Sequence, residues 1–410
     1  MNNTPELLSP AGDLDKMRFG IAYGADAVYM AGTRFGMRAA ATNFDDNALR
    51  EGIAYAHAHG VKCYITVNIM PSNRDLPALP AYLELLQDAG ADALIIADVG
   101  VLRMARRYAP RVPVHISTQT SILNHEAANY WADEGAERIV LARELSLEEI
   151  AEIRAKTPKE LEIEAFVHGA MCISYSGRCL ISQYMTGRDA NHGACAQPCR
   201  WNYSLMEEKR PGQFFPVEED GRGTYLYNSK DMCMIEYVPE LIEAGITSFK
   251  IEGRNKTAYY AACVTGAYRA AIDTYKKDPE NFVLPQFCRD EVNKVSHREY
   301  YTGFYFGNQE NGQHYGDSQY IREYEVVGMP VECDDSGKAV FALKNRFFDG
   351  EELELIQPGQ APYVFRAENV TDDEGTKREL FNVPQMRVHF AFPFKVSEWA
   401  ILRKVKERPE

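Results

Sequence analysis

The first part of the chain, up to about residue 275, repeats one pattern of polar and hydrophobic positions. An amphipathic segment ends at a glycine, and a short apolar run follows at once, as in "YGADAVYM", "HGVKCYITV", "AGADALIIAD", "EGAERIVLA" and "AGITSFKIE". A glycine after a helix supplies the left-handed backbone that closes the last turn. A short apolar run directly after it is typical of a buried parallel strand. The repeating unit is therefore a helix followed by a strand.

Eight apolar runs predict strands, and they begin at residues 6, 27, 62, 93, 112, 138, 162 and 248. Amphipathic segments such as "LPAYLELLQDAG" and "HEAANYWADEG" separate most of them and predict helices. Eight such units within one domain favour a TIM-type (β/α)8 barrel over an open doubly wound sheet. None of these strands is followed by G-x-G-x-x-G, which argues against a dinucleotide site.

Two departures from the repeat define the domains. A cysteine-rich insertion at about 168–235 follows the seventh strand. Beyond residue 300, aromatic and β-branched runs alternate with turn sequences such as "DDSG", "FDG" and "DDEG", which is typical of a small antiparallel β-barrel. We therefore predict a barrel domain over 1–295, which carries the insertion, and a C-terminal β-barrel domain over 300–410.

Composition narrows the class of protein. A chain of 410 residues can bury two cores, and its 45% hydrophobic and 25% charged residues are ordinary globular values. The N-terminus does not resemble a signal peptide and no apolar run is long enough to span a bilayer, so we expect a cytoplasmic protein without membrane contact. The net charge of -14 argues against a protein that coats nucleic acid, although it allows a local basic channel.

Cysteine spacing is the strongest chemical signal. Four thiols follow the spacing Cys172-x6-Cys179-x15-Cys195-x3-Cys199, and Cys233 lies further on. In a reducing compartment such a group indicates metal binding or catalysis rather than disulfides. Structural zinc usually takes two tight cysteine pairs, whereas iron–sulfur clusters also accept scattered ligands. The remaining thiols, which we expect in the core, are Cys63, Cys263, Cys288 and Cys333.

Polar residues recur where the predicted strands end. Catalytic groups of TIM barrels lie at the C-terminal ends of the strands, and the cysteine insertion leaves the same rim directly after His168. We therefore expect the cysteines and the rim residues to face one cavity. The rim residues are Ser9, Asn68, Asp98, His115, Ser117, Gln119, Glu144, His168, Lys250, Glu252 and Arg254.

Several stretches together resemble one known family. They are "PELLSPAGDLDKMRFGIAYGADAVYMAG" at the start, "EAFVHGAMCISYSGRCLIS" with "QPCRW" and "NSKDMC" in the insertion, and "KNRFFDGEELELIQPG" near the end. The chain is similar in all of them to the U32 family, long labelled collagenase-like peptidases. The resemblance covers the barrel and extends to the C-terminal domain.

The resemblance implies an oxygen-independent hydroxylase with a 4Fe-4S cluster on four cysteines. One branch of the family forms 5-hydroxyuridine at the tRNA wobble position with prephenate as a required metabolite; others modify 23S rRNA or act in ubiquinone synthesis. Length and the single C-terminal domain make this chain most similar to the tRNA branch, so tRNA and a small anionic metabolite are the expected partners. The implied cluster ligands are Cys172, Cys179, Cys195 and Cys233, with Cys199 as the alternate to Cys195.

Roles for the other residues follow from their chemistry. Lys250 and Arg254 are candidates to hold a dicarboxylate or an RNA phosphate, because Arg matches a carboxylate with two donors. Glu252 would orient one of them, and His115 and His168 are candidates for proton transfer. Within the insertion, the candidates for RNA contact are Arg178, Arg188, Arg200, Trp201 and Tyr203. A second candidate contact in the C-terminal domain is formed by Lys344, Asn345 and Arg346.

Other functions stay open at this point. A peptidase would need an activated nucleophile or a metal-bound water, and the chain has no H-E-x-x-H or G-x-S-x-G motif. A cysteine protease that pairs Cys172 with His168 or His192 is the remaining form of that hypothesis. A non-catalytic redox scaffold is a further alternative, and the sequence leaves the oligomeric state and the electron donor open.

Overall fold

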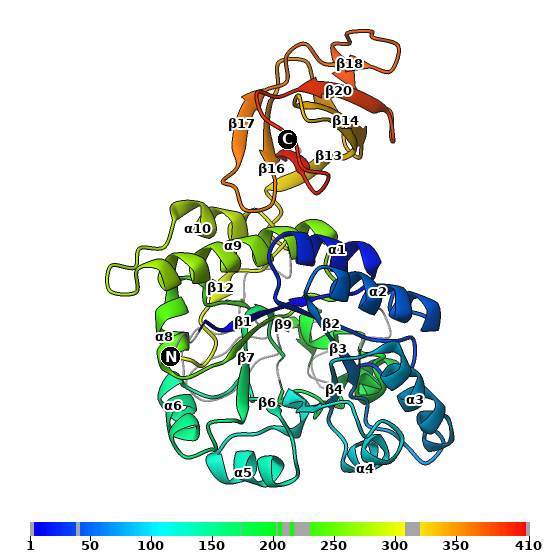
Figure 1. Cartoon of the computed structure of the whole chain (residues 1–410), viewed down its shortest axis with the longest axis vertical. Helices are drawn as coiled ribbons and strands as arrows, with labels where there is room; N and C mark the ends of the chain where they lie inside the picture. Colours follow the sequence, from blue (N-terminus) through cyan, green and yellow to red (C-terminus); the bar gives the residue numbers. More distant parts are fainter. Residues whose placement is uncertain are drawn as a thin grey trace.

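The structure is a computed structural model that describes residues 4–37, 42–172, 174–201, 204–206, 214–216, 230–307 and 320–406. Its N-terminal part is a closed parallel barrel, since the eighth strand, β11, pairs with both β1 and β7 (Figure 1). This confirms the predicted (β/α)8 architecture. The barrel strands are β1 Glu6–Pro10, β2 Ala27–Met30, β3 Lys62–Val67, β4 Ala93–Ile96, β5 Val114–Ile116, β6 Arg138–Val140, β7 Glu162–Ala170 and β11 Ser248–Ile251.

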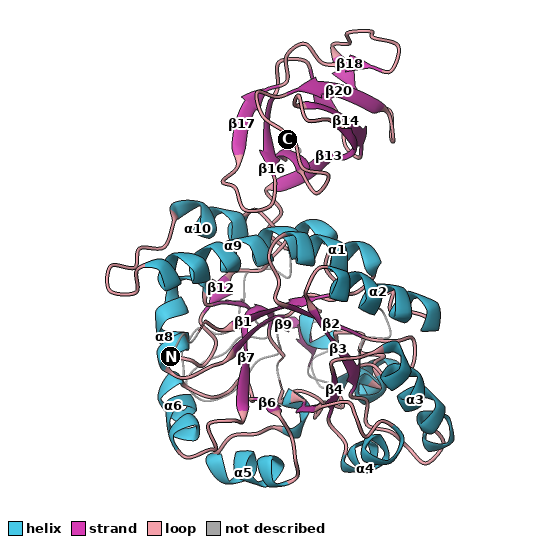
Figure 2. Ribbon diagram, viewed as in Figure 1, coloured by secondary structure: helices cyan, strands magenta, loops and turns pink. Residues whose placement is uncertain are grey.

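Helices surround these strands (Figure 2). Five glycines of the predicted repeat end or follow helices with left-handed φ angles of 71° to 99°, as the pattern requires. These are Gly24, Gly60, Gly90, Gly135 and Gly245. The α-helices are α1 Leu14–Ala22, α2 Asp46–Ala58, α3 Leu79–Ala89, α4 Val99–Tyr108, α5 His125–Asp133, α6 Leu147–Ala155, α7 Ile181–Thr186, α8 Val238–Glu243, α9 Ala258–Lys277 and α10 Gln286–Asn293. The 3-10 turns are η1 Leu76–Ala78, η2 Thr118–Thr120, η3 Ala190–His192, η4 Pro198–Arg200 and η5 Ile235–Tyr237. Of the described helices, none is both long and apolar enough to cross a membrane.

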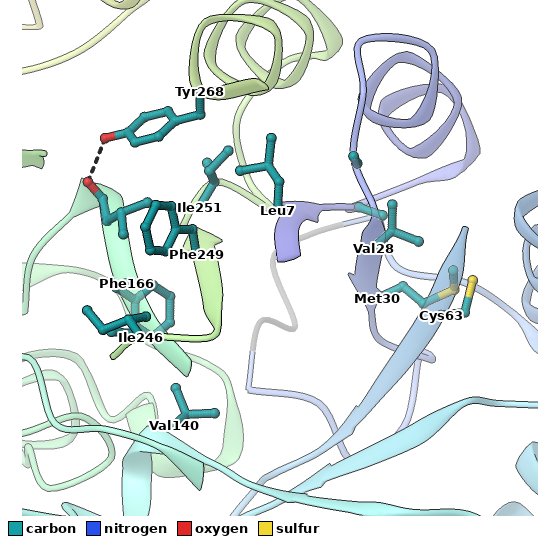
Figure 3. Packing of buried hydrophobic residues seen from close by; sticks show 14 of the residues in the cluster. Leu7, Val28, Met30, Cys63, Val140, Phe166, Ile246, Phe249, Ile251 and Tyr268 are labelled. Atoms are coloured by element: carbon teal, nitrogen blue, oxygen red, sulfur yellow. Dashed lines mark hydrogen bonds between the residues drawn. The ribbon is translucent and has the colours of Figure 1, made fainter. Parts of the chain in front are cut away.

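The core lies between the strands and the helices. Leu7, Val28 and Met30 are fully buried on the helix-facing side of the sheet, and Cys63 packs beside Met30 (Figure 3). Cys63, Cys263 and Cys288 are buried as predicted, whereas Cys333 is partly exposed. Burial in apolar surroundings raises the pKa of Cys288 to about 12, so this thiol stays protonated at neutral pH.

The cysteine insertion leaves the barrel after β7 and returns at β10 (Asp231–Cys233), which runs antiparallel to the end of β7. The short strand β12 (Tyr300–Tyr301) extends the same sheet beside β10. Within the insertion, β8 (Ser204–Met206) and β9 (Phe214–Pro216) form an antiparallel pair. The insertion is therefore attached to the barrel at the rim where the parallel strands end.

The C-terminal domain is an antiparallel half-barrel, as the alternation of aromatic runs and turns predicts. Its main sheet has the order β17-β16-β21-β13-β14-β20-β18, and β15 pairs with β19. Stacked phenylalanines such as Phe347 and Phe381, with centroids 4.8 Å apart, fill its core. The strands are β13 Tyr324–Cys333, β14 Lys338–Leu343, β15 Phe347–Phe348, β16 Glu352–Ile356, β17 Tyr363–Arg366, β18 Thr371–Asp372, β19 Leu380–Phe381, β20 Arg387–Ala391 and β21 Ile401–Val405.

A buried ion-pair cluster joins the two domains beside α9 and α10 (Figure 1). Arg403 of β21 is fully buried and donates to Glu291 of α10 and to Glu354 of β16. Trp399 packs edge-on against Phe19 of α1 at 5.3 Å. Because buried charges must be paired to be tolerated, these contacts fix the C-terminal domain against the barrel.

Candidate active site

A cavity of about 960 Å³ opens at the C-terminal ends of the barrel strands. Three parts of the chain form most of its wall: the strand ends of the barrel with the segments that follow them, the cysteine insertion and the C-terminal domain. Polar residues at these ends were predicted to face one cavity, and six of them do. They are Asn68, Ser117, Gln119, Lys250, Glu252 and Arg254.

Two other predicted rim residues, Ser9 and Asp98, have structural roles instead. Ser9 is fully buried, and its Oγ lies 2.9 Å from Thr265 Oγ1. Asp98 caps α4 by accepting a hydrogen bond from the backbone N–H of Val101 at 2.9 Å. Glu144 is not part of the described cavity wall, and burial raises its pKa. A polar residue at a strand end can therefore serve packing or capping as well as chemistry.

The cavity is cationic, although the whole chain carries a net charge of -14. Among the described residues of its wall, seven side chains are cationic and two, Glu252 and Glu325, are carboxylates. A concave surface of one sign focuses its field and attracts ligands of opposite charge. The cationic residues are Arg143, Lys250, Arg254, Lys256, Arg322, Lys344 and Lys406.

Lys250 is positioned by a chain of charges that fills the barrel interior. Its Nζ donates to Glu164 Oε1 at 2.6 Å and lies 4.5 Å from the centre of the Tyr29 ring. Glu164 in turn accepts from Arg138 at 3.0 Å, and Arg138 also donates to Glu6 at 2.6 Å. Burial lowers the pKa of Lys250 and the carboxylate of Glu164 opposes that shift. The pair therefore holds a desolvated ammonium group at the cavity floor.

Two glycines, Gly12 and Gly169, pack closely against the backbone of Glu252 and Arg254. A Cβ on Gly12 would lie 2.0 Å from the carbonyl oxygen of Arg254, and a Cβ on Gly169 would lie 2.4 Å from that of Glu252. Gly169 also has a φ of +107°, which a side chain would strain. Both glycines belong to stretches that carry the family resemblance, "SPAGD" and "HGAMC". They let the barrel approach residues 252–254 closely and so fix where these two side chains enter the cavity.

An amide relay connects β3 to β5 across the cavity wall. The backbone N–H of Met37 donates to Asn68 Oδ1 at 3.3 Å, which turns Asn68 Nδ2 toward Gln119 Oε1, 2.6 Å away. Ser117 Oγ donates to the same oxygen at 3.0 Å. The relay leaves Gln119 Nε2 as a buried donor without an acceptor in the described part of the chain. Such a donor is costly to bury unless a ligand satisfies it.

Three of the cysteines line this cavity: Cys172, Cys195 and Cys199. Cys179 and Cys233 are not among its described lining residues. Cys233 lies opposite His168 in the β10–β7 pair, and burial raises the pKa of its thiol to about 12. None of the five thiols forms a disulfide bond in the described part of the chain. In the described part of the chain, no three His, Cys, Asp or Glu side chains converge closely enough to form a metal-binding group.

The cysteine wall nevertheless suits an anionic sulfur-ligated group by its chemistry. Gly177 lies between Cys172 and Cys179 with a φ of +75°, and a Cβ there would lie 3.1 Å from Gln119 Nε2. The unsatisfied amide therefore faces the backbone of the cysteine segment itself. Thiols lining a cavity, a glycine without room for a side chain and an N–H donor that lacks an acceptor together fit an iron–sulfur cluster, which takes thiolate ligands and hydrogen bonds to sulfur.

The predicted histidines do not reach the cavity. His168 is 1% exposed and lies among Tyr260, Tyr268 and Tyr300, and burial lowers its pKa to about 3. His115 lies deeper in the barrel against Tyr64, with ring centroids 4.6 Å apart, and burial with nearby Arg138 lowers its pKa well below the usual value. Neither is a described lining residue of the cavity. The structure therefore gives no support to the proton-transfer roles predicted for them. The aromatic packing that encloses both rings joins distant segments and cannot be seen in the sequence.

The predicted RNA contacts of the insertion are only partly described. Arg178 is exposed and donates to Ser121 Oγ at 3.3 Å, outside the cavity wall. Trp201 is 44% exposed. The side chain of Arg200 and the whole of Tyr203 lie outside the described residues. The C-terminal residues Lys344 and Asn345, in contrast, line the cavity together with Lys406, which the sequence analysis did not single out.

Comparison with known proteins identifies relatives over the whole chain. The profile described as "Peptidase family U32" matches residues 12–315, and "Peptidase family U32 C-terminal domain" matches 322–403. The chain is 39% identical to "tRNA hydroxylation protein P1" of Bacillus subtilis over 98% of this chain and 95% of that protein. It is 37% identical to "tRNA hydroxylation protein P" of Escherichia coli over 90% of each. A 23S rRNA 5-hydroxycytidine synthase of Escherichia coli is 40% identical over 80% of this chain and 48% of that protein.

Proposed function

Because the chain belongs to peptidase family U32, we propose that it is an oxygen-independent, iron–sulfur-dependent tRNA hydroxylase. Its product would be 5-hydroxyuridine at the wobble position, and prephenate would be the required metabolite. The observation that carries the proposal is the cationic cavity at the barrel rim with three thiols in its wall. Relatives that align along nearly the entire chain are named for tRNA hydroxylation, which favours tRNA over the rRNA and quinone alternatives.

The charge of the cavity supports an anionic substrate and an anionic co-substrate. An acidic protein that places seven cations around one cavity repels polyanions elsewhere and attracts them there. RNA supplies phosphates, and prephenate supplies two carboxylates. We assign Lys250 and Arg254 to the metabolite, because both are at least 95% buried and face the cavity floor. The more exposed cations at the mouth, Arg322, Lys344 and Lys406, are assigned to RNA.

The cysteines would hold the cluster. We retain Cys172, Cys179, Cys195 and Cys233 as ligands with Cys199 as the alternate, and the cavity wall supports Cys172, Cys195 and Cys199 directly. A bound cluster would supply electron transfer to the reaction. Gln119 would donate its unsatisfied Nε2–H to a sulfur of that group, since the amide relay holds it against the cysteine segment.

With water as the oxygen source, replacement of the uridine C5–H by C5–OH would release two protons and two electrons. The cluster would pass the electrons on to an external acceptor, and a basic residue of the site would have to accept a proton. Of the three residues predicted for acid–base or orienting roles, Glu252 is the one that lines the cavity. Its backbone is anchored on both sides: its N–H donates to the His168 carbonyl at 2.9 Å, and its carbonyl accepts from Tyr260 Oη at 2.9 Å. We therefore assign proton transfer to Glu252. His168 contributes by fixing the backbone of Glu252 through its own carbonyl.

The peptidase hypothesis has less support. A cysteine protease needs a histidine within hydrogen-bond reach of its thiol, and no histidine is among the described residues that line the cavity. His192, the other candidate partner for Cys172, hydrogen-bonds to Asp189 and lies outside the described cavity wall that contains Cys172. A redox scaffold without catalysis would not explain a pocket in which buried Lys250 and Arg254 face several thiols.

Nucleoside analysis of tRNA from cells that lack the protein tests the proposal. We expect mass spectrometry to show that 5-hydroxyuridine and its derivatives are lost, and that wild-type protein restores them while the Cys172→Ser variant does not. Unchanged tRNA with an altered 23S rRNA or quinone pool would assign the chain to another activity of the family.

A further inference from the structure

A second groove, on the C-terminal domain, continues the cavity outward. It has a volume of about 520 Å³ and shares Glu325, Lys344, Asn345 and Lys406 with the cavity wall. The groove lies between the turn that joins β14 to β15, the segment after β19 and the end of the last strand, β21. Its remaining lining residues are Leu343, Arg346, Asn382, Val383 and Pro384.

The turn at residues 344–346 is held rigidly against β13. The backbone N–H groups of Lys344 and Asn345 both donate to the carbonyl of Val327, at 2.8 and 3.2 Å. The side-chain Nδ2 of Asn345 donates to the carbonyl of Val326 at 2.8 Å. These three bonds use the backbone N–H groups of Lys344 and Asn345 and the side-chain amide of Asn345 to hold the turn against β13. The side chains of Lys344 and Arg346 are left exposed beside the groove.

Two cations of this groove form no ion pair in the described part of the chain, although Glu325 also lines the groove. In the part of the chain that the structure describes, neither Lys344 nor Lys406 forms an ion pair, although both are exposed. Nearby cations of the same domain behave differently: Lys404 lies 2.9 Å from Glu351, and Arg403 pairs with Glu291 and Glu354. An acidic protein that leaves two lysines unpaired at the mouth of a cationic cavity presents a site for phosphate oxygens.

Apolar side chains are exposed in the groove and beside it, where an unpaired base can stack. Phe348 is not among the described lining residues of the groove, but it is 41% exposed directly after the turn, and the Arg346 guanidinium lies 6.0 Å from the centre of its ring. Val383, which lines the groove, is 50% exposed. Proteins that bind single-stranded nucleic acid combine cations along the backbone with aromatic faces for the bases.

We propose that this groove, formed by Lys344, Arg346 and Lys406, binds the sugar-phosphate backbone of the RNA whose target nucleotide enters the barrel cavity. This inference rests on the proposed function and adds to it the place where the RNA leaves the active site. Continuity with the cavity and charge complementarity select RNA as the occupant. The C-terminal domain is then a substrate-binding element that acts at a distance from the chemistry.

The test compares two triple variants of the full-length holoprotein with the same change in net charge. The first carries Lys344→Gln, Arg346→Gln and Lys406→Gln. The control carries Lys159→Gln, Lys276→Gln and Lys277→Gln, which replace exposed lysines at the far end of β7 and at the end of α9. Binding of a fluorescent tRNA anticodon arm is measured by anisotropy over a series of salt concentrations.

We expect the groove variant to bind at least about tenfold more weakly in moderate salt. The slope of log K against log salt should become shallower by about 2.1 to 2.7, because three phosphate contacts are lost at roughly 0.7 to 0.9 each. The control should bind like wild type. Equal weakening of both variants would assign the effect to net charge and overturn the inference, as would a groove variant with wild-type affinity and slope. If wild-type protein does not bind the RNA at all, the proposed function itself fails.

Discussion

Lys250 Nζ lies 2.6 Å from Glu164 Oε1, and Glu164 is completely buried between this ammonium group and Arg138. The carboxylate of Glu164 thus favours the charged form of Lys250 and opposes the lowering of the Lys250 pKa that burial causes. This pair links the closed interior of the barrel to the cavity in which the chemistry is proposed to occur.

Replacing Glu164→Gln should therefore weaken binding of the anionic metabolite most strongly at alkaline pH. Without the carboxylate, burial lowers the pKa of Lys250 further, so the cationic form is lost earlier as pH rises. Calorimetric titration with prephenate between pH 7 and 9 measures this effect. The matched control is Glu162→Gln, which removes another partner of Arg138 without touching Lys250. Identical pH profiles for the two variants would contradict the role assigned to Glu164.

Gln119→Leu should make the reduction potential of the reconstituted cluster more negative. A hydrogen bond to sulfur stabilises the reduced, more negatively charged state, and a bond of about 1 kcal/mol corresponds to about 40 mV for one electron. The relay from Met37 through Asn68 holds this donor in place. Thr120→Val, in the same turn, is the control, since Thr120 Oγ1 donates to the Ser117 carbonyl instead. An unchanged reduction potential in Gln119→Leu would show that the Gln119 amide does not donate a hydrogen bond to the cluster.

Arg403→Met should destabilise the protein by about 3 kcal/mol, because it removes the fully buried guanidinium that Glu291 and Glu354 share and leaves them only Lys294, at 3.6 and 2.9 Å, as a common cation. Urea unfolding followed by fluorescence measures the change in the free energy of unfolding. Arg387→Met provides the contrast, since its ion pair with Glu332 is exposed to solvent and its loss should change the free energy of unfolding much less. Similar losses in the two variants would show that the domain interface does not depend on the buried cluster.

His115 should make the protein sensitive to mild acid. Burial lowers its pKa in the folded state, so below the unfolded value of about 6.5 the unfolded chain binds a proton that the folded chain does not. Stability from this group is complete above that pH and falls by up to about 1.4 kcal/mol per pH unit below it. Urea unfolding at pH 7 and pH 5.5 should show a smaller pH effect in His115→Gln than in wild type. An equal effect in both would mean that His115 is not held neutral by the fold.

Much of the fold is visible in the sequence because its determinants are local. A glycine such as Gly90 must adopt a positive φ to end its helix, and the apolar run at 93–96 must then be buried, so the order of helices and strands follows directly. The polar strand ends Lys250 and Arg254 are located by the same reasoning, since parallel strands end at one rim.

The contacts that assemble the site are not local and could not be predicted. Asn68 and Gln119 are separated by 51 residues, and their hydrogen bond depends on how β3 and β5 lie across the barrel. Lys406 reaches the cavity because the C-terminal domain packs beside α9 and α10. His168 looked suited to proton transfer from its place before the cysteines, yet three tyrosines from distant segments enclose it.

Turnover by purified protein tests whether the chain is a prephenate-dependent tRNA hydroxylase. The cluster is reconstituted anaerobically, the protein is incubated with unmodified tRNA and prephenate, and the digested tRNA is analysed by nucleoside mass spectrometry. We expect 5-hydroxyuridine to form only when prephenate is present and to be absent with Cys172→Ser or Lys250→Met. Formation of 5-hydroxyuridine by the Cys172→Ser protein without iron, or failure of a fully loaded wild-type protein to modify tRNA, would contradict it.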